Sequence, residues 1–429
     1  MTAPRTLDER VALLMQGTDY GDDGLRQAMA DELRQRLGLA DKENRPLRVY
    51  AGFDPRTSDL HLGHMVPIRK LGQFQRLGHD VTFLVGRYTA LIGDPSDKDK
   101  LRPRITPEEA AHNAETYSEQ AFRSKLLDPA ATTIDFNDRW LSKLDFAELI
   151  EIASNFTVQQ FLTRETFRKR FDDGDALFVH EFFYALMQAY DAYHLRADVQ
   201  VGGSDQLFNI ITAARKLMEA KGVPPNIGIV LGILPGTDGE IKMSKSLGNH
   251  IPLLSAPADM FGKVMSVPDK AMPAYFRLTT RWGPDEIAAV ETGLSSGEVH
   301  PRDAKMQLAA EIVATYYGPN QAAQAQAEFE RVFQQGALPA DMDEYQVKPG
   351  VTLVDLLAES GLAASKSQGR RLIDQGGVRL DGQTLDDPAW QVSLTQASVL
   401  QVGKRRFLRL LPGNHEDAKG TKGEEPVGS

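Results

Sequence analysis

The stretch that decides the fold covers residues 48–85 and reads RVYAGFDPRTSDLHLGHMVPIRKLGQFQRLGHDVTFLV. Residues 48–53 and 80–85 are β-prone runs, and the segment from about residue 64 to residue 77 has a helical pattern. Strand, helix and strand in this order form a βαβ unit, which requires parallel strands covered by helices. Further strand-like runs occupy residues 198–201 and 227–234. We therefore predict an α/β fold with a doubly wound parallel sheet.

The rest of the chain predicts additional domains. We expect the α/β region to cover residues 1–240, with an inserted helical region at about residues 100–190. The strand signal disappears from about residue 260, and apolar residues at four-residue steps predict an α-helical domain over residues 241–336. Two prolines and a cluster of acids indicate a linker at residues 337–350. A small α+β domain should follow at residues 351–412, and the polar residues 413–429 should be disordered.

The composition excludes several classes of protein. The chain has 429 residues, of which 41% are hydrophobic and 25% are charged, as in ordinary globular proteins. It has no cysteine, which excludes disulfides, thiolate zinc sites and cysteine nucleophiles. No apolar run approaches the roughly 18 residues of a membrane helix, and the N-terminus lacks an apolar signal core. We expect a cytoplasmic protein without membrane contacts.

Charge is shared unevenly along the chain. The formal net charge is -10, but eight basic and six acidic residues give residues 350–412 a charge of +2. The bases are clustered, which favours an RNA-binding surface over a merely solubilising one. The expected RNA-binding residues are Lys366, Arg370, Arg371, Lys404, Arg405 and Arg406.

Two histidines open the helix of the βαβ unit. In His61-Leu62-Gly63-His64 the three-residue spacing places both imidazoles on one face of the first turn. The glycine lets a ligand approach the backbone, and a helix N-terminus offers N–H groups to a phosphate. Two ordinary surface histidines would be the alternative. Because doubly wound sheets bind nucleotides at this place, the motif favours a phosphate-binding site.

A second basic motif, Lys242-Met243-Ser244-Lys245-Ser246, follows the last strand-like run. Two lysines three residues apart on a loop can close over a polyphosphate and neutralise the charge of a leaving group. Alone, this loop would be a solvated basic segment. Together with HLGH, in this order on an α/β framework, it resembles the pair of motifs that marks class I aminoacyl-tRNA synthetases.

Residues 182–193, FFYALMQAYDAY, contain a single charged residue, Asp191, so this helix should be buried. Tyr184, Gln188 and Asp191 form a polar stripe on an otherwise apolar and aromatic helix. A buried carboxylate needs a partner, and a ligand phenol that donates to Asp191 and accepts from Tyr50 would supply one. A structural polar network between helices is the alternative.

The chain resembles bacterial tyrosyl-tRNA synthetases over nearly its whole length. The matching segments are residues 50–64, 91–96, 184–191 and 201–206, KMSKS, residues 300–313 and the C-terminal module. The resemblance implies a Rossmann-like catalytic domain, an α-helical anticodon-binding domain and a small RNA-binding domain of the ribosomal-protein type. It also implies activation of L-tyrosine with ATP, carried with Mg²⁺, and transfer of tyrosine to tRNA(Tyr). A homodimer is implied as well, with its surface in the inserted helices, and no residue is assigned as a metal ligand.

The resemblance also implies roles for individual residues. Those expected to bind tyrosine are Tyr50, Asp94, Tyr184, Gln188, Asp191 and Gln206. Among them, Tyr50 and Asp191 would take the phenol. Those expected to bind ATP are Gly52, Asp54, His61, His64, Gly203, Asp205, Lys242 and Lys245, with Asp205 on the ribose. Those expected to act on the triphosphate are His61, His64, Lys98, Arg102, Lys242 and Lys245.

Three residues depart from the commonest pattern of the family: Arg56, Ala90 and Asp97. Arg56 and Asp97 should lie near the phosphates, so the contacts that these two positions make with ATP are not predicted from the family pattern. A tryptophanyl-tRNA synthetase and a non-catalytic RNA-binding synthetase paralogue remain alternatives. Other nucleotidyltransferases also use HxGH, but they have no evident use for the helical and RNA-binding modules.

Overall fold

The computed structural model describes residues 6–55, 60–95, 105–333, 342–403 and 406–412. It contains two compact units, residues 1–329 and residues 330–429, which are described separately. The predicted disordered tail and residues 337–341 of the predicted linker lie outside the described residues.

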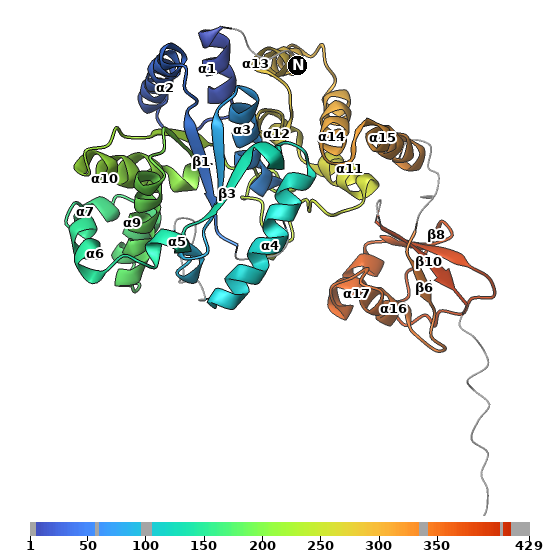
Figure 1. Ribbon diagram of the computed structural model, residues 1–429. Helices are drawn as coiled ribbons and strands as arrows, with labels where there is room; N and C mark the ends of the chain where they lie inside the picture. The colour runs from blue at the N-terminus through green and yellow to red at the C-terminus, as the bar shows by residue number, and fades with distance from the viewer. Residues whose placement is uncertain (1–5, 56–59, 96–104, 334–341, 404–405, 413–429) are drawn as a thin grey trace, which may run out of the picture. The chain divides into compact units, whose positions relative to one another are not determined.

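The first unit is built on a parallel sheet with helices on both faces (Figure 1). Its strands are β1 (Arg48–Phe53), β2 (Asp80–Val85), β3 (Thr132–Phe136), β4 (Val199–Gly203) and β5 (Ile227–Leu231). They run parallel in the order β3-β2-β1-β4-β5. Every residue of β5 is buried, as expected for a strand covered on both faces. The doubly wound sheet predicted from the sequence is confirmed.

Helices of the α/β part surround this sheet. They are α1 (Leu7–Met15), α2 (Asp23–Glu43), α3 (Leu62–Arg76), α4 (Pro107–Arg123), α9 (Val179–His194) and α10 (Arg215–Ala220). Short helices precede α9, namely α5 (Asp138–Leu141), α6 (Phe146–Ala153), α7 (Val158–Phe161) and α8 (Glu165–Asp172). A π-helical segment, Phe208–Ala214, leads into α10. Helix α3 packs against β1, β2 and β4, so its N-terminus lies at the carboxyl ends of the central strands.

The remainder of the first unit is helical. Its helices are α11 (Pro257–Ser266), α12 (Met272–Thr279), α13 (Pro284–Ser296), α14 (Pro301–Tyr317) and α15 (Pro319–Phe333). The last residues of α15 fall beyond the boundary of the unit. The apolar steps noted in the sequence belong to α14, where Ala304, Leu308 and Ile312 are fully buried. These helices share one hydrophobic core with the sheet, so the predicted parts 1–240 and 241–336 lie largely within one compact unit.

Lys70, in the middle of α3, is fully buried. Its ammonium donates hydrogen bonds to the carbonyl oxygens of Leu13, Leu14 and Gln16, at 3.1, 2.9 and 2.9 Å. These carbonyls lie at the C-terminal end of α1, where the regular hydrogen bonds of the helix run out; that of Leu13 also accepts from the Gln16 N–H at the C-cap. A lysine from one helix therefore caps another and holds it against α3.

The neighbouring Arg69, 3% exposed, does the same for α12. Its guanidinium donates to the carbonyl oxygens of Arg277, at 3.3 Å, and of Thr280. Further along α3, a Cβ at Gly72 would come within 1.9 Å of the Leu126 carbonyl oxygen, so only glycine allows this close approach. Helix α3 is thus held from several sides.

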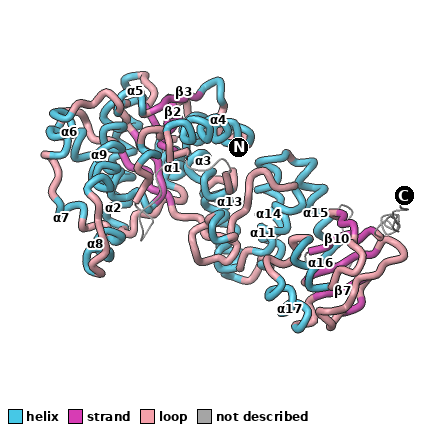
Figure 2. Tube along the Cα trace, turned by 90° about the horizontal axis from the view of Figure 1, so that it is seen from below, coloured by secondary structure: helices cyan, strands magenta, loops and turns pink. Residues whose placement is uncertain are grey.

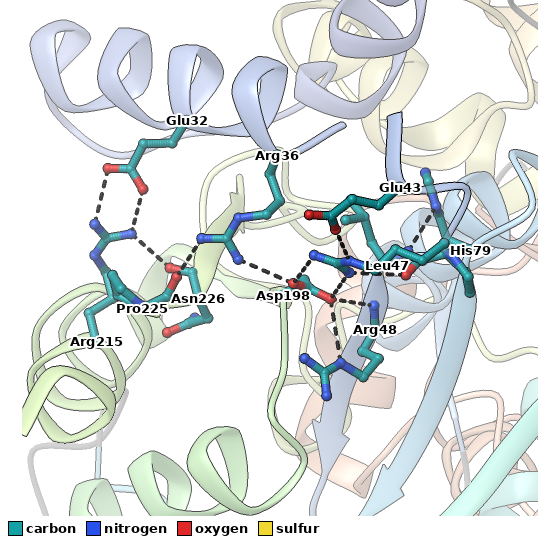
Figure 3. Close-up of polar contacts among 12 residues, drawn as sticks. Glu32, Arg36, Glu43, Leu47, Arg48, His79, Asp198, Arg215, Pro225 and Asn226 are labelled. Carbon is teal, nitrogen blue, oxygen red and sulfur yellow. Dashed lines mark hydrogen bonds and ion pairs between the residues drawn. The ribbon is translucent and has the colours of Figure 1, made fainter. Parts of the chain in front are cut away.

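A network of charges lies at the amino ends of β1 and β4 (Figure 3). Asp198, directly before β4, accepts hydrogen bonds from the guanidinium groups of Arg36 and Arg45 at 3.2 and 3.1 Å, and from the Arg48 backbone N–H at 3.0 Å. Burial opposes ionisation of Asp198, but the hydrogen bonds from the Arg48 N–H and from Arg45, with the charges of both side chains, outweigh it and keep the pKa of Asp198 below its usual value. Because Arg36 belongs to α2, this carboxylate fastens α2 to the sheet, at the end opposite to the carboxyl ends of the strands.

The second unit is a small α+β domain, as predicted. Its strands are β6 (Glu344–Gln346), β7 (Val378–Leu380), β8 (Gln383–Thr384), β9 (Ser398–Val402) and β10 (Arg406–Leu411), in the order β6-β10-β9-β7-β8. Two helices, α16 (Leu353–Glu359) and α17 (Lys366–Asp374), complete it. Leu353, Leu357, Leu400 and Leu410 are fully buried in its core.

Two predicted boundaries differ from the structure. Residues 344–346 of the predicted linker form β6, which pairs in parallel with β10, so they belong to the second unit's sheet. The region predicted as a helical insertion, about 100–190, contains β3. Strand β3 is an edge strand with the polar sequence TTIDF and no fully buried residue, so it has no apolar run by which to recognise it.

Candidate active site

A cavity of about 640 Å³ lies where the chain order of the sheet reverses. The chain continues from β1 to β2 and β3 on one side, and β4 and β5 lie on the other. Gly52 near the end of β1 and Gly203 at the end of β4 both line the cavity. Ligands of open α/β sheets bind at such a point, so the fold itself selects this cavity.

At one end of the cavity lies Asp191, which is 3% exposed. Its Oδ1 accepts a hydrogen bond from Trp140 Nε1 at 2.7 Å, and its Oδ2 accepts one from Asn137 Nδ2 at 3.2 Å. Burial raises the pKa of Asp191 to about 8, although these two hydrogen bonds act in the opposite direction. Asn137 and Trp140 were not identified from the sequence, because they follow β3, the strand that the sequence does not reveal.

Tyr50 lies on β1 beside this carboxylate. Its hydroxyl is buried and has no hydrogen-bond partner among the described residues. Burial and the nearby charge of Asp191 raise the pKa of this phenol well above its usual value, so it remains a donor. A buried carboxyl group and a hydroxyl without a partner among the described residues thus lie together at one end of the cavity, which suits a ligand hydroxyl.

The next group of residues centres on Asp54, just beyond β1. Its Oδ1 accepts a hydrogen bond from Thr89 Oγ1 at 2.7 Å, and its Oδ2 accepts one from the Tyr184 hydroxyl at 3.0 Å. A Cβ at position 86 would lie 2.2 Å from Asp54 Oδ1, so Gly86 is required for this arrangement. Tyr184 and Asp54, expected on the tyrosine and ATP sides, are therefore in direct contact.

Three further residues expected to bind tyrosine are joined by an amide network. Gln206 Nε2 donates to the Asp94 carboxylate. Asn209 Nδ2 donates to Gln188 Oε1 at 3.0 Å and to Gln206 Oε1 at 2.9 Å. Asn209 lies in the π-helical segment, a conformation frequent at functional sites, and no sequence pattern indicates it.

His61 and His64 are stacked at the start of α3, with ring centroids 3.8 Å apart. The Gly63 N–H donates to His61 Nδ1 and the His61 N–H donates to His64 Nδ1, both at 3.2 Å. Burial and nearby positive charges lower the pKa of His61 to about 2 and that of His64 to about 4. Both rings are therefore neutral at pH 7, with the proton on Nε2, and each offers an N–H donor without a net charge.

Lys242 and Asp205 form an ion pair across the cavity, with Nζ and Oδ2 2.7 Å apart. The segment that follows KMSKS also contacts the start of α3, because the Leu62 N–H donates to the Ile251 carbonyl oxygen at 3.1 Å. The two motifs identified in the sequence, far apart along the chain, thus lie on walls of the same cavity.

Asn249 holds the KMSKS loop from behind. Its Oδ1 accepts a hydrogen bond from the Ser244 N–H at 2.8 Å, and its Nδ2 donates to Asp238 Oδ2 at 2.5 Å. Asp238 in turn accepts from the N–H groups of Glu240 and Ile241. The conformation of the loop therefore depends on a residue outside the motif, which the sequence analysis did not single out.

The described residues with expected roles in tyrosine or ATP binding all line this cavity: Tyr50, Gly52, Asp54, His61, His64, Asp94, Tyr184, Gln188, Asp191, Gly203, Asp205, Gln206, Lys242 and Lys245. Lys98 and Arg102 lie outside the described residues, as do Arg56 and Asp97. Ala90 is fully buried in a short 3₁₀ helix, Thr89–Leu91.

The basic residues of the second unit are described by themselves, as far as the structure covers them. Arg370 and Arg371 are exposed on α17, whereas Lys366 pairs with Asp355 at 2.7 Å. Arg406, at the start of β10, donates to the Leu362 carbonyl oxygen. Lys404 and Arg405 lie outside the described residues.

Two sequence families match the chain. Residues 42–334 match the tRNA synthetases class I (W and Y), and residues 351–396 match the S4 domain. The first match covers more than half of the chain and includes every described residue that lines the cavity. The chain therefore belongs to the class I tRNA synthetases of the W and Y family.

Curated relatives define the branch of this family. The chain is 48% identical to the tyrosine–tRNA ligase of Moorella thermoacetica over 381 residues, which cover 89% of this chain and 92% of the relative. It is 44% identical to that of Thermotoga maritima over 383 residues, which cover 89% and 94%. Both relatives belong to the tyrosine branch.

Solved structures share the fold at lower identity. A C-terminally truncated mitochondrial tyrosyl-tRNA synthetase from Aspergillus nidulans matches with a TM-score of 0.60 and 23% identity, over 77% of this chain and 95% of that one. The enzyme from Archaeoglobus fulgidus, solved with L-tyrosine, matches with a TM-score of 0.57 and 21% identity, over 75% and 100%.

Within the described part of the chain, no helix is long and apolar enough to cross a membrane. The same residues contain no group of three or more histidine, cysteine, aspartate or glutamate side chains that could hold a metal ion.

The raised pKa of Asp191 predicts a pH dependence of stability. The carboxyl pKa is about 8 in the folded protein and about 4 when unfolded. The folded state therefore binds more protons between these values, and stability is lost as the pH rises. From pH 5 to pH 8.5, the unfolding free energy of the ligand-free protein should fall by on the order of 4 kcal/mol relative to Asp191→Asn.

Calorimetric unfolding of both proteins across this pH range measures the difference. Glu298→Gln, at an exposed residue beyond α13, serves as control and should follow the wild type. Parallel curves for Asp191→Asn and the wild type would contradict the assignment of this titration to Asp191.

Proposed function

We propose that this protein is a tyrosine–tRNA ligase that activates L-tyrosine with ATP and transfers it to the 3′ end of tRNA(Tyr). The observation that carries the proposal is the buried pair of Asp191 and Tyr50 in the same cavity as HLGH and KMSKS. The pair recognises a phenolic hydroxyl, and the two motifs recognise the phosphates of ATP. A single cavity thus accommodates both substrates of the first half-reaction.

In the first step, the tyrosine carboxylate attacks the α-phosphorus of ATP in line and expels pyrophosphate. No side chain forms a covalent intermediate, so the residues act by positioning and by stabilising charge. The tyrosine ammonium lies against the carboxylate of Asp94 and the polar groups of Tyr184 and Gln188, while Gln206 orients the tyrosine carboxylate. Mg²⁺ bound to ATP would neutralise charge on the phosphate oxygens, and no cluster of acidic or histidine side chains among the described residues would hold it directly.

The nucleotide rearranges the Lys242–Asp205 ion pair. Asp205 takes the ribose hydroxyls, and Lys242 moves onto the phosphates with Lys245. His61 and His64 donate N–H groups to the same phosphates without adding charge. Among the described residues, the positive charge that faces the phosphates therefore comes from the two lysines, which can follow the departing pyrophosphate; Lys98 and Arg102 are expected to add to it.

In the second step, a ribose hydroxyl at the 3′ end of tRNA attacks the activated carbonyl and releases AMP. Both steps belong to translation, and we therefore place the protein in the cytoplasm. The phenol pair also distinguishes tyrosine from tryptophan, whose indole N–H can donate to Asp191 but cannot accept from Tyr50. This favours tyrosine over the tryptophan alternative within the same family.

The function is tested by ATP–pyrophosphate exchange without tRNA, with tyrosine, tryptophan and phenylalanine compared. We expect exchange with tyrosine. In Asp191→Ala, most of the preference in kcat/KM for tyrosine over phenylalanine should disappear, because the group that the substrate hydroxyl satisfies is gone. Sites built to bind a substrate hydroxyl reject analogues without it by about 10⁴–10⁵ in general, and tyrosyl-tRNA synthetases are the standard example of that rule.

Asp172→Ala, on the exposed surface, should keep the preference of the wild type. Exchange with tryptophan alone would show that the substrate is tryptophan and would contradict the proposed tyrosine specificity. Folded protein that exchanges with none of the three amino acids would favour a non-catalytic paralogue.

We also propose that the protein is a homodimer through the helices α6 to α9. Large exposed apolar side chains gather on this segment: Phe146, Ile150, Val158, Phe171, Phe178 and Val179. The helices that bear them lie together at one end of the first unit (Figures 1 and 2). Exposed apolar surface of this extent is typical of a face that another protein covers, and a second copy of the chain offers the same apolar face.

Val179→Glu tests the dimer. Val179 is 69% exposed, so the substitution leaves the core intact but would bury a charge in the interface. We expect a shift from dimer to monomer in sedimentation equilibrium. The exposed Glu298→Gln, beyond α13, is the control and should remain dimeric. A wild-type monomer at micromolar concentration would contradict the proposal.

We further propose that the second unit binds the tRNA backbone. Arg370 and Arg371 are exposed on α17, and Lys366 and Arg406 lie on the same unit with local partners. The match of residues 351–396 to the S4 domain supports this assignment. Binding through phosphates releases counterions, so the affinity should fall steeply with salt.

Arg370→Ala combined with Arg371→Ala should weaken tRNA binding. It should also reduce the slope of log K against log salt by about 1 for each phosphate that the variant no longer neutralises. Filter binding at several salt concentrations measures this slope, and tyrosine-dependent exchange should stay unchanged. Lys348→Ala is the matched control, because Lys348 is already paired with Glu359 at 2.6 Å. Equal slopes for the control and the double variant would contradict the assignment.

A further inference from the structure

The first unit contains a second cavity, of about 760 Å³, which shares no lining residue with the candidate active site. Its walls come from the C-terminal ends of α3, α4 and α14, together with Leu13 of α1 and Arg281 beyond α12. The volume lies within the range of sites for small molecules. Neither the reaction nor the two sequence motifs involves this cavity.

The cavity is lined by four basic side chains and, among the described residues, by no acidic one: Arg76, Arg123, Lys125 and Arg281. Arg281 pairs with Glu311, outside the lining, at 2.8 Å. Burial and the charge of Arg281 both lower the pKa of Arg76, so the two guanidinium groups are close enough to repel each other. An anion in the cavity would relieve this repulsion, and guanidinium groups match phosphate geometry well.

A second, independent observation concerns Gln73 on α3, which also lines the cavity. Its side chain is 1% exposed, and neither Oε1 nor Nε2 has a hydrogen-bond partner among the described residues. A buried amide without partners costs free energy that a ligand with polar groups would recover. Only a group that enters the cavity can reach Gln73, which favours a small molecule over a nucleic-acid backbone that lies along the surface.

We propose that this cavity binds a small phosphate-bearing molecule of nucleotide size. Arg76, with Arg123 and Lys125 at the rim, holds the phosphate, and Gln73 pairs with a polar group of the part that enters the cavity. Tyr316 and Tyr317 in the wall offer apolar surface to a planar group. Because the site joins α14 to the end of α3, an occupied cavity stabilises the first unit.

The probe is AMP, titrated calorimetrically at low ionic strength into the full-length wild type, Arg76→Ala and Gln73→Leu. The active site binds AMP in every variant, so the wild type should show two classes of site. Arg76→Ala should weaken the second class about tenfold or more, since it removes a charge-assisted hydrogen bond. Arg302→Ala, an exposed residue at the other end of α14, is the matched control and should titrate like the wild type.

Gln73→Leu keeps the side-chain volume and removes the two unpartnered polar atoms. It should raise the thermal midpoint of the ligand-free protein while weakening the second class of AMP binding. Tyrosine-dependent exchange should be unchanged in both variants, so the result does not depend on the outcome for the active site.

A single class of AMP site in the wild type, or two unchanged classes in both variants, would overturn the proposal. If Arg76→Ala and Arg302→Ala bind AMP alike but only Arg76→Ala weakens tRNA binding, the basic rim contacts RNA, and the small-molecule site is refuted.

Discussion

Lys70 and Arg69 are buried at the centre of α3 and donate hydrogen bonds to the C-terminal carbonyls of α1 and α12. An unpaired buried charge would cost several kcal/mol, and the helix ends would otherwise leave carbonyls unsatisfied. The hydrogen bonds between these side chains and the helix-end carbonyls avoid both costs. Since α3 begins with the HLGH motif, these contacts also fix where the two histidines lie relative to the sheet. The position of the active-site cavity therefore depends on two residues that do not line it.

The cavity separates its two tasks by electrostatics. At the end that we propose takes the phenol, Asp191 is buried with two neutral donors, Trp140 and Asn137, and its pKa is raised, while the Tyr50 hydroxyl has no partner among the described residues. This pocket is therefore only partly satisfied without a ligand hydroxyl. At the nucleotide end, His61 and His64 are neutral, and Lys242 is held by Asp205. The polar and charged groups at both ends of the cavity are thus arranged so that bound ligands would supply the missing hydrogen-bond and charge partners.

The sequence predicted those parts that have strong local patterns. The apolar strand of residues 227–231, the helix that contains Asp191 and both lysine and histidine motifs were all recognisable, because burial or a special spacing marks them. Strand β3 was not, since an edge strand needs no apolar run, and Asn137 and Trp140 were missed with it. Asn209 and Asn249 were also missed, because an amide that orients a neighbour has no pattern in sequence and depends on contacts formed only in the fold.

The Lys242–Asp205 ion pair explains how Lys242 can be both ordered and free to move. A partly exposed ion pair is worth about 0–1 kcal/mol, so it holds Lys242 without trapping it. The Asn249 hydrogen bonds at the base of the loop do not involve Lys242, so they can remain if Lys242 exchanges Asp205 for phosphate as proposed. The Asn249 contacts limit the positions that Lys242 can reach, and the weak ion pair determines how easily Lys242 leaves Asp205. If both the Asn249 contacts and the Lys242–Asp205 pair were strong, Lys242 could not leave Asp205. If both were weak, the loop would not be held near the phosphates. A strongly held base with a weakly held lysine therefore suits a residue that we propose follows the leaving group.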